Sequence, residues 1–432
     1  MSSSEMSPEE GAVAQRADLR RLIDEQATSA GEREFADRAL AFLSSHVGLR
    51  QPVESAWGSG PERLELFHET TDEEERREAD EALAWQATKF DAGFGWISGP
   101  TEHGGAGLPA SYDRLFRLLE SYFDVPDPGP IRIGIGTIGP TLVRFGEPEI
   151  IERYARPLYQ GHSIACQLFS EPGAGSDLAG VATQAEPKAG GWRVNGQKVW
   201  TSNAQFADFG LALMRTDPTQ PRHGGLSMLL VDMDLPGVEV RPIRQMTGGA
   251  SFTEVFLTDV EVPPNRVIGE IGAGWQIATA TLTGERKAVG DRTHETLSRA
   301  MALLATYGLR HDSFDDRAKR RQWGAVQTAV RAARLRQQAI QSVPDDEANP
   351  AERTLDKLLT AANMAEIGEL AQELLGPEYV ADTGEWGTFG WNKWRMGALG
   401  YRIAGGTEEV LKTLVAERVL GLPREPRLEN RS

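Results

Sequence analysis

The segment CQLFSEPGAGSDLAG, residues 166–180, is the stretch that decides how the chain is interpreted. Its first residues suit an extended strand, and Pro172 and the glycines of the GAG triplet then force a turn. Ser176 and Asp177 stand at the exit of that turn, so the segment offers backbone N–H groups and a hydroxyl to a polar ligand. A capped turn that only connects two elements is the alternative that these residues leave open.

The sequence after this turn has the short alternation of β-strands. GWRVNGQKVW, residues 191–200, carries strand-like runs on both sides of an Asn195–Gly196 pair, which predicts a hairpin turn there. Further strand-like runs follow between Asp, Gly and Pro residues: FGLALMRT, GLSMLLVDM, VEVRPI and FTEVFLTDVEV. We therefore expect a β domain over residues 164–268.

Helical spacing of apolar residues dominates on both sides of this β domain. We expect an N-terminal helical domain over residues 16–163, in which the charged run at 70–83 is a solvated helix face. A C-terminal helical domain is expected over residues 269–425, with a disordered N-terminus at 1–15 and a tail at 426–432. Helices, strands and helices in that order predict an α+β protein instead of an alternating βαβ fold.

Composition excludes several classes of function. The 432 residues are 40% hydrophobic and 25% charged, which is typical of a globular chain. The net charge of −17 leaves no basic surface for nucleic acid or an anionic membrane. No apolar run approaches the roughly 20 residues of a membrane helix, and the N-terminus lacks the apolar core of a signal peptide.

The motif search and the cysteine count narrow the chemistry further. Cys166 is the single cysteine, so an intrachain disulfide and a multi-cysteine metal site are both excluded. A reducing compartment, the cytoplasm, is the expected location. The sequence has no GxGxxG motif after a strand, no P-loop and no HExxH motif. We expect no metal site.

Four segments together resemble the acyl-CoA dehydrogenase family. They are EPGAGSD at 171–177, NGQKVWTSN at 195–203, FTEVFLTDVEVPPNRVIGEIGAGW at 252–275 and IAGGTEEVLKTLVAERVLGLPRE at 403–425. The resemblance runs from about residue 90 to 425 with the family's order and spacing. It implies an N-terminal helical domain, a middle β domain and a C-terminal four-helix bundle, with FAD in the cleft between the last two.

The resemblance also implies an activity and partners. The expected reaction is α,β-desaturation of an acyl-CoA thioester, in which a base removes the α-proton and flavin takes the β-hydride. Such enzymes serve lipid metabolism, including the degradation of fatty acids or sterol side chains. An electron-transfer flavoprotein is the expected acceptor, and a homo- or hetero-oligomer is the expected assembly.

The family's contacts with FAD map onto three segments of this chain. Gln167, Phe169 and Ser170 precede the EPGAGSD turn, and the resemblance places them beside the isoalloxazine ring. The second group is Trp200, Thr201 and Ser202, where an indole face and hydroxyls suit a flavin. Thr407, after a glycine pair, matches a further FAD contact. Ser176 matches a contact with the acyl-CoA ligand, and its alternative role is to cap the turn.

The catalytic base is expected on the first helix of the C-terminal domain. Many family members carry a glutamate where this chain has Gly405, and glycine cannot accept a proton. The isovaleryl- and long-chain-type branch places the base directly before an arginine, which here corresponds to Glu285 and Arg286. Arg286 is assigned to the substrate side. The backbone N–H of Gly405 keeps the ability to donate to the thioester carbonyl. A surface role for Glu285 is the alternative.

Two departures from the family pattern affect the expected assembly. Arg310 and Phe314 match only loosely an arginine–aromatic–glycine motif that contacts FAD across a subunit interface, and Glu373 replaces a family glutamine. The alternatives are therefore a subunit of a hetero-oligomeric dehydrogenase without its own complete active site, a flavin oxidase or monooxygenase, and a non-enzymatic helical scaffold.

Overall fold

The computed structural model describes residues 19–50, 57–58, 64, 66–67, 71–220, 222–341, 343 and 350–424, and of residues 284–292, 341 and 350–353 it describes only the backbone. The segments expected to be disordered, 1–15 and 426–432, lie outside these ranges. The chain divides into two compact units. The first contains the described parts of Met1–Pro52, Thr71–Cys166 and Phe206–Phe209, and the second contains the remainder.

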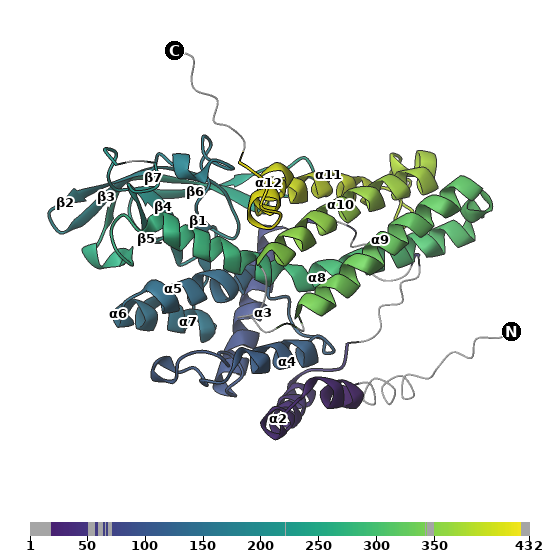
Figure 1. The fold of residues 1–432 in the computed structure, drawn as a ribbon, viewed down its shortest axis with the longest axis horizontal. Helices are drawn as coiled ribbons and strands as arrows, with labels where there is room; N and C mark the ends of the chain where they lie inside the picture. The colour runs from purple at the N-terminus through teal and green to yellow at the C-terminus, as the bar shows by residue number, and fades with distance from the viewer. Residues whose placement is uncertain are drawn as a thin grey trace, which may run out of the picture. The chain divides into compact units, whose positions relative to one another are not determined.

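The first unit is built from helices (Figure 1). After helical residues 19–26, these are α2 (Ala30–His46), α3 (Asp72–Asp91), η1 (Thr101–His103), α4 (Ala110–Glu120), η2 (Gly129–Ile131), η3 (Gly134–Ile138), α5 (Gly139–Phe145), α6 (Pro148–Ile150), η4 (Ile151–Ala155) and α7 (Arg156–Tyr159). Capping boxes begin two of them: Ser29 with Glu32 starts α2, and Thr71 with Glu74 starts α3. The charged run at 70–83 is thus the capped, solvated start of α3.

Aromatic packing holds this unit together. Phe35, Phe42, Phe94 and Phe116 lie in one buried cluster, and the Phe94 and Phe116 rings stack with their centroids 5.0 Å apart. Such ring pairs add about 0.5–1.5 kcal/mol beyond the burial of their area. The unit therefore has a core of its own.

A mainly antiparallel sheet forms the middle of the chain. Its strands are β1 (Ala165–Leu168), β2 (Gln184–Lys188), β3 (Gly191–Thr201), β4 (Phe209–Arg215), β5 (Leu226–Asp232), β6 (Val238–Ile243), β7 (Phe252–Val262) and β8 (Val267–Ile268), with the short turns η5 (Leu178–Gly180) and η6 (Pro264–Arg266). The strand order is β6-β7-β3-β2-β4-β5-β8, and β1 pairs with β4. Strands β4 and β5 are almost fully buried because they lie inside the sheet.

The hairpin predicted at Asn195–Gly196 is wrong. Strand β3 runs through this pair without turning, and the hairpin lies earlier, where Lys188 of β2 pairs with Gly191 of β3. A register shift between Val194 and Gly196 marks an irregularity against β7. Gly196 is required there because a Cβ atom would lie 2.3 Å from Oγ1 of Thr183. The glycine thus serves a close backbone approach instead of a turn.

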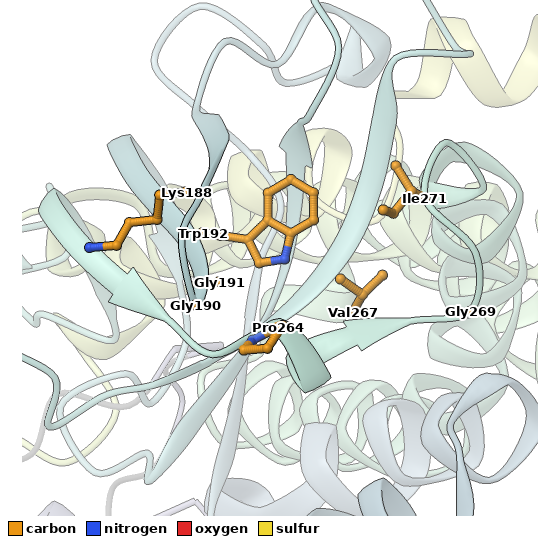
Figure 2. Close-up of a pocket in the computed structure, with 8 residues that line it drawn as sticks. All are labelled: Lys188, Gly190, Gly191, Trp192, Pro264, Val267, Gly269 and Ile271. Atoms are coloured by element: carbon orange, nitrogen blue, oxygen red, sulfur yellow. The ribbon is translucent and has the colours of Figure 1, made fainter.

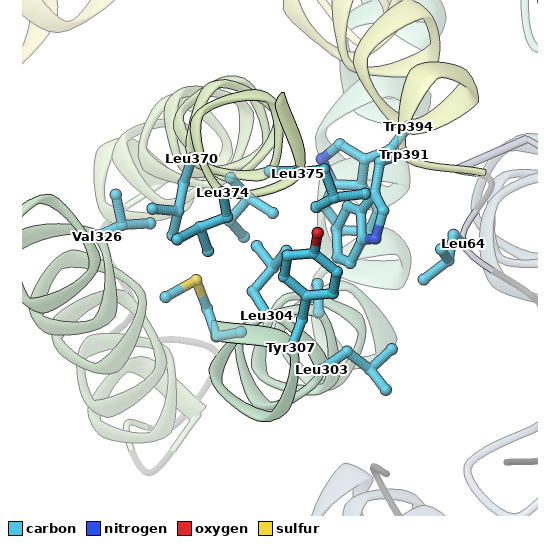
Figure 3. Packing of buried hydrophobic residues seen from close by; sticks show 14 of the residues in the cluster. Leu64, Leu303, Leu304, Tyr307, Val326, Leu370, Leu374, Leu375, Trp391 and Trp394 are labelled. Atoms are coloured by element: carbon cyan, nitrogen blue, oxygen red, sulfur yellow. The ribbon is translucent and has the colours of Figure 1, made fainter. Parts of the chain in front are cut away.

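The C-terminal part of the second unit is helical. Its elements are α8 (Gly274–Arg310), η7 (Ser313–Asp315), α9 (Arg317–Gln341), α10 (Pro350–Leu375), η8 (Gly376–Tyr379), α11 (Gly390–Ile403) and α12 (Glu408–Arg418). Figure 3 shows side chains from α8, α9, α10 and α11 converging on a shared core, with Tyr307, Leu370, Trp391 and Trp394 among them. The predicted α+β architecture, with a C-terminal helical domain after the sheet, is confirmed.

Two searches over the described residues exclude features that the sequence also lacked. None of the helices there joins sufficient length to the apolar character needed to cross a membrane. No group of three or more His, Cys, Asp and Glu side chains there is placed to hold a metal ion. Cys166 is buried, and burial raises the pKa of its thiol to about 12, so the thiol stays protonated at neutral pH.

Candidate functional site

The EPGAGSD segment forms the tight turn that the sequence predicted. The backbone N–H of Glu171 donates to the Ala174 carbonyl at 3.0 Å, and the Ala174 N–H donates back to Glu171 at 3.0 Å. Beyond this closed turn, Ser176 is exposed, which leaves its hydroxyl accessible to a ligand. Arg222 forms an ion pair with Asp177 next to it.

Two segments that lie well apart in the sequence are side by side here. The Val199 N–H donates to the Ser170 carbonyl at 2.9 Å, which ties the end of β1 to the end of β3. Gln167 and Ser170 are half-buried, and Phe169 is buried. The structure therefore brings the first two groups of expected flavin contacts together.

Trp200 stands out on β3 by its backbone and by its exposure. Its φ angle is 61°, a left-handed conformation that bulky residues rarely adopt. The pairing of β3 with β7 shifts register between Lys198 and Thr201, so the strand bulges at this point. The bulge turns the indole outward with 59% of its surface exposed, whereas Val199 is buried. Trp200 is thus not a core aromatic of the sheet.

Thr201 supplies a polar atom that fits a cofactor. Its side chain is 1% exposed, and its Oγ1 atom has no hydrogen-bond partner within the described part of the chain. Buried hydroxyls are rarely left without a partner, so an unmet hydroxyl indicates a missing ligand or water. Ser202 follows it and is half-buried. An exposed indole beside an unmet hydroxyl suits a flavin, which has a flat apolar face and a polar edge.

The turn between α11 and α12 carries the last group of expected residues. Gly405 and Gly406 have φ angles of 66° and 98°, and Thr407 begins α12 by accepting the Val410 N–H at 3.3 Å. Gly405 is exposed, and a Cβ atom placed on it would meet nothing within 4 Å. The backbone N–H of Gly405 therefore lies in open space.

Three charged side chains hold this turn from outside. Arg402 at the end of α11 donates twice to Glu408 at the start of α12, at 2.9 and 3.0 Å. Lys357 of α10 donates to the Gly406 carbonyl at 2.8 Å. Arg402 first, by its hydrogen bonds and charge, lowers the pKa of Glu408, so the pair stays ionised at neutral pH.

The expected base is placed only by its backbone. Glu285 and Arg286 belong to α8, as the sequence predicted for a long C-terminal helix, but their side chains lie outside the described residues. Arg310 at the end of the same helix donates to the Trp57 carbonyl at 2.5 Å. Phe314 packs against the C-terminal core, near the Trp323 ring.

A separate pocket of about 530 Å³ lies at the hairpin between β2 and β3 and the segment around β8 (Figure 2). It is lined by Lys188, Gly190, Gly191, Trp192, Pro264, Val267, Gly269 and Ile271. Lys188 is paired with Glu261, and the remaining lining is glycine or apolar. None of the expected cofactor or substrate residues lines this pocket.

Sequence reasoning missed the ionic groups that support the site. Lys198 and Glu171 form a buried ion pair, and Arg402 and Glu408 brace the glycine turn. A signal for Lys198 was present, because the alternation that buries Trp192 and Val194 reaches Lys198 on the same parity. No spacing rule pairs it with Glu171, which lies 27 residues earlier.

Comparison with known proteins identifies the class. Residues 166–260 match the family model described as acyl-CoA dehydrogenase, middle domain, and residues 272–420 match the one described as acyl-CoA dehydrogenase, C-terminal domain. The chain belongs to the acyl-CoA dehydrogenase family. It is an oxidoreductase acting on acyl-CoA, and its cofactor is FAD, as in the family at large.

The relatives are mycobacterial. The chain is 38% identical over 347 residues to acyl-CoA dehydrogenase IpdE1 of Mycobacterium tuberculosis, covering 80% of this chain and 89% of that one. It is 36% identical to IpdE1 of Mycolicibacterium smegmatis, covering 91% and 98%. Among solved structures, the ChsE4-ChsE5 complex from Mycobacterium tuberculosis shares the fold, with a TM-score of 0.69, 24% identity and coverage of 92% and 99%.

Proposed function

We propose that the chain catalyses the α,β-desaturation of an acyl-CoA thioester. The single observation that carries this proposal is the joining of the Ser170 and Trp200 segments at one edge of the sheet, with an unmet buried hydroxyl on Thr201. FAD, when bound, supplies the acceptor for the hydride that leaves the β-carbon. Gln167, Phe169, Ser170, Trp200, Thr201, Ser202 and Thr407 are the residues proposed to hold it.

The proton chemistry is assigned to two groups. Glu285 on α8 is the proposed base that removes the α-proton, since Gly405 has no side chain to do so. The Gly405 N–H is the proposed donor to the thioester oxygen as negative charge develops there. Ser176 and Arg286 are proposed to contact the acyl-CoA. The exposed position of Ser176 and the open space around Gly405 support these roles.

The space at Gly405 also bears on the substrate. A glutamate at this position would fill volume that glycine leaves free, so a branched or bulky acyl group is the proposed substrate class. One solved protein of this fold is the Tcur3481-Tcur3483 steroid ACAD, which shares 23% identity at a TM-score of 0.70. An electron-transfer flavoprotein is the proposed electron acceptor, and the domain boundaries at 163/164 and 268/269 are proposed as functional divisions.

The test is anaerobic mixing of the FAD-loaded protein with a panel of acyl-CoA thioesters that runs from straight short chains to branched and polycyclic ones. Bleaching of the flavin absorbance, with formation of the enoyl-CoA, is the expected result. No bleaching with any thioester, while dithionite bleaches the same sample, contradicts the proposal. Rapid reoxidation by oxygen with release of peroxide identifies a flavin oxidase instead.

A second candidate is a subunit of a hetero-oligomeric dehydrogenase. The observation that favours it is the contact of Arg310 with the Trp57 carbonyl, which engages the guanidinium expected to reach a neighbouring FAD. The solved structures of similar fold include complexes of two named components. Sedimentation with flavin quantification distinguishes the two: one FAD per chain in a homo-oligomer supports an independent enzyme, and substoichiometric FAD supports a missing partner.

A further inference from the structure

Lys198 is the most deeply buried charged side chain beside the candidate flavin site. None of its surface is exposed, although it lies on β3 only two residues before Trp200. Its ammonium donates to Glu171 Oε1 at 2.7 Å, to the Leu213 carbonyl at 2.7 Å and to the Phe169 carbonyl at 3.2 Å. All three N–H bonds of the ammonium are therefore used.

Glu171 completes the network on the other side. Besides Lys198, its carboxylate accepts the backbone N–H groups of Ala182 at 2.6 Å and Thr183 at 3.0 Å. Glu171 is also the first residue of the EPGAGSD turn, closed by its own backbone bonds to Ala174. One ion pair thus connects the turn, the start of β2 and the middle of the sheet.

Both segments expected to contact the flavin are fixed by this network. The Phe169 carbonyl is held by Lys198, and the next carbonyl, that of Ser170, is held by the Val199 N–H. On β3 the strained backbone of Trp200 begins immediately after these two anchors, at the bulge between Lys198 and Thr201. A left-handed tryptophan persists only where its surroundings fix the chain on both sides.

We propose that the buried Lys198–Glu171 ion pair is a positioning device that sets the Phe169–Ser170 and Trp200–Ser202 segments in register for the flavin. It rests on the proposed function in one respect, the assignment of these two segments to FAD. Lys198 and Glu171 are positioning residues, because they act on the flavin only through the backbone that they hold.

Ionisation agrees with this geometry. Burial lowers the pKa of Lys198 to about 8, and Glu171 beside it opposes that shift, so the ammonium persists at neutral pH. Burial works against the charge of Glu171, but Lys198 and the backbone donors outweigh it and lower the pKa of the carboxyl. A buried pair of this kind contributes little net stability compared with an apolar pair, which makes a purely structural reason for it weak.

The test replaces Lys198 by methionine, which keeps the length of the side chain and removes the charge and its donors. We expect the Lys198→Met protein to bind FAD about tenfold more weakly, the effect of one or two lost hydrogen bonds to the cofactor. Its flavin spectrum and midpoint potential should shift as well. Flavin titration of the apoprotein and potentiometry of the loaded protein measure these effects without any turnover.

Two control variants separate positioning from stability. Lys188→Met removes a lysine of the neighbouring strand, whose pair with Glu261 is on the surface, and should leave FAD affinity unchanged. Val194→Ala opens a cavity in the fully buried core of β3 and should lower the melting temperature while keeping the flavin spectrum. Lys198→Met behaving like Val194→Ala, with reduced stability but parental FAD affinity and spectrum, overturns the proposal.

Glu171→Gln keeps the test decisive if Lys198→Met does not fold. The amide retains the shape of the carboxyl but cannot pair with the ammonium, so the same weakening of FAD binding is expected. Parental affinity and spectrum in a folded Glu171→Gln protein also overturn the proposal. The proposed function fails separately, because it requires that the parent protein be bleached by an acyl-CoA.

Discussion

Arg402 and Glu408 form a doubly hydrogen-bonded ion pair across the base of the turn that carries Gly405, with Nε to Oε1 at 2.9 Å and Nη2 to Oε2 at 3.0 Å. The pair joins the last turn of α11 to the first residue of α12. Because the fork of a guanidinium matches both carboxylate oxygens, it fixes direction as well as distance. The position of the Gly405 N–H therefore depends on this contact.

Arg402→Lys should slow flavin reduction by acyl-CoA, because an ammonium cannot reproduce the two-bond fork. A displacement of the turn by about 1 Å can reduce the rate by up to about 100-fold. Stopped-flow reduction of the flavin is the measurement. Arg241→Lys is the matched control: Arg241 bonds Glu239 with the same fork, at 2.7 and 2.9 Å, but spans no turn. Equal rates in both variants and the parent would remove the turn from the mechanism.

Trp200 and Trp192 should respond in opposite ways to truncation, although both lie on β3. Trp192 is 8% exposed, so Trp192→Ala should destabilise the fold by about 3–5 kcal/mol. Trp200 is 59% exposed, so Trp200→Ala should change stability little and weaken FAD binding by up to about tenfold through lost stacking. Thermal melts of the apoproteins and FAD titrations check both. A Trp200→Ala protein that melts far below the parent contradicts this assignment.

Much of this architecture could be predicted from the sequence because it depends on local patterns. Apolar spacing indicated the helices, alternation indicated the strands, and the EPGAGSD turn follows from its proline and glycines. The Asn195–Gly196 hairpin failed for a tertiary reason: Thr183 packs against Gly196, and Asn195 bonds Asp259 of β7 at 3.1 Å. Competition from such contacts outweighs a turn preference, which the sequence alone does not reveal.

The candidate site divides in the same way. The residues proposed to contact FAD come from short motifs, so their chain positions were accessible from the sequence. The supporting pairs, Lys198 with Glu171 and Arg402 with Glu408, depend on the folding of distant or turn-separated residues onto each other. The left-handed conformation of Trp200 is equally a result of the bulge, since tryptophan has no intrinsic preference for it.

Glu285→Gln should abolish reduction of the flavin by acyl-CoA while FAD stays bound. Glutamine keeps the size of glutamate but cannot accept the α-proton, and loss of a positioned base reduces the rate by roughly 10²–10⁴-fold. Dithionite should still bleach the flavin, because that route needs no base. Glu295→Gln, on the same helix, is the control and should retain the parental rate. A rate for Glu285→Gln within a few-fold of the parent shows that another group is the base.

Stability should depend on the charge of Glu171 in acid. Its pKa is lowered in the folded protein, so its contribution is fully present above the ordinary glutamate value of 4.5 and is lost as the pH falls through the lowered value. Glu171→Gln should therefore be less stable than the parent at pH 7 by about 3 kcal/mol, since it leaves a buried ammonium unpaired. Denaturant titrations from pH 7 down to pH 3 should show this difference shrinking below pH 4.5. A difference that does not change with pH contradicts the ionic role.

The two glycines of the α11–α12 turn should tolerate a side chain to different extents. At Gly405 a Cβ atom meets nothing within 4 Å, and the φ of 66° lies in the left-handed region that other residues enter at roughly 1–2 kcal/mol. At Gly406 the φ is 98°, and a Cβ atom would lie 3.0 Å from Cδ2 of Leu411, which is fully buried. Gly405→Ala should therefore fold and bind FAD, whereas Gly406→Ala should be clearly less stable and should displace Thr407. Thermal melts and FAD titrations of the two variants check this, and equal stabilities contradict it.

Gly405→Glu extends this comparison to the chemistry. Its carboxylate would stand where many family members carry their base, so adding it to Glu285→Gln should restore part of the lost flavin reduction. The new side chain also fills the space proposed for a branched or bulky acyl group, so the restored activity should favour straight-chain thioesters. The measurement is the rate of flavin bleaching across the thioester panel for the parent, Glu285→Gln and the double variant. Restored activity that still prefers bulky thioesters contradicts the idea that Gly405 makes room for them, and no restoration in a folded, FAD-loaded double variant contradicts the equivalence of the two base positions.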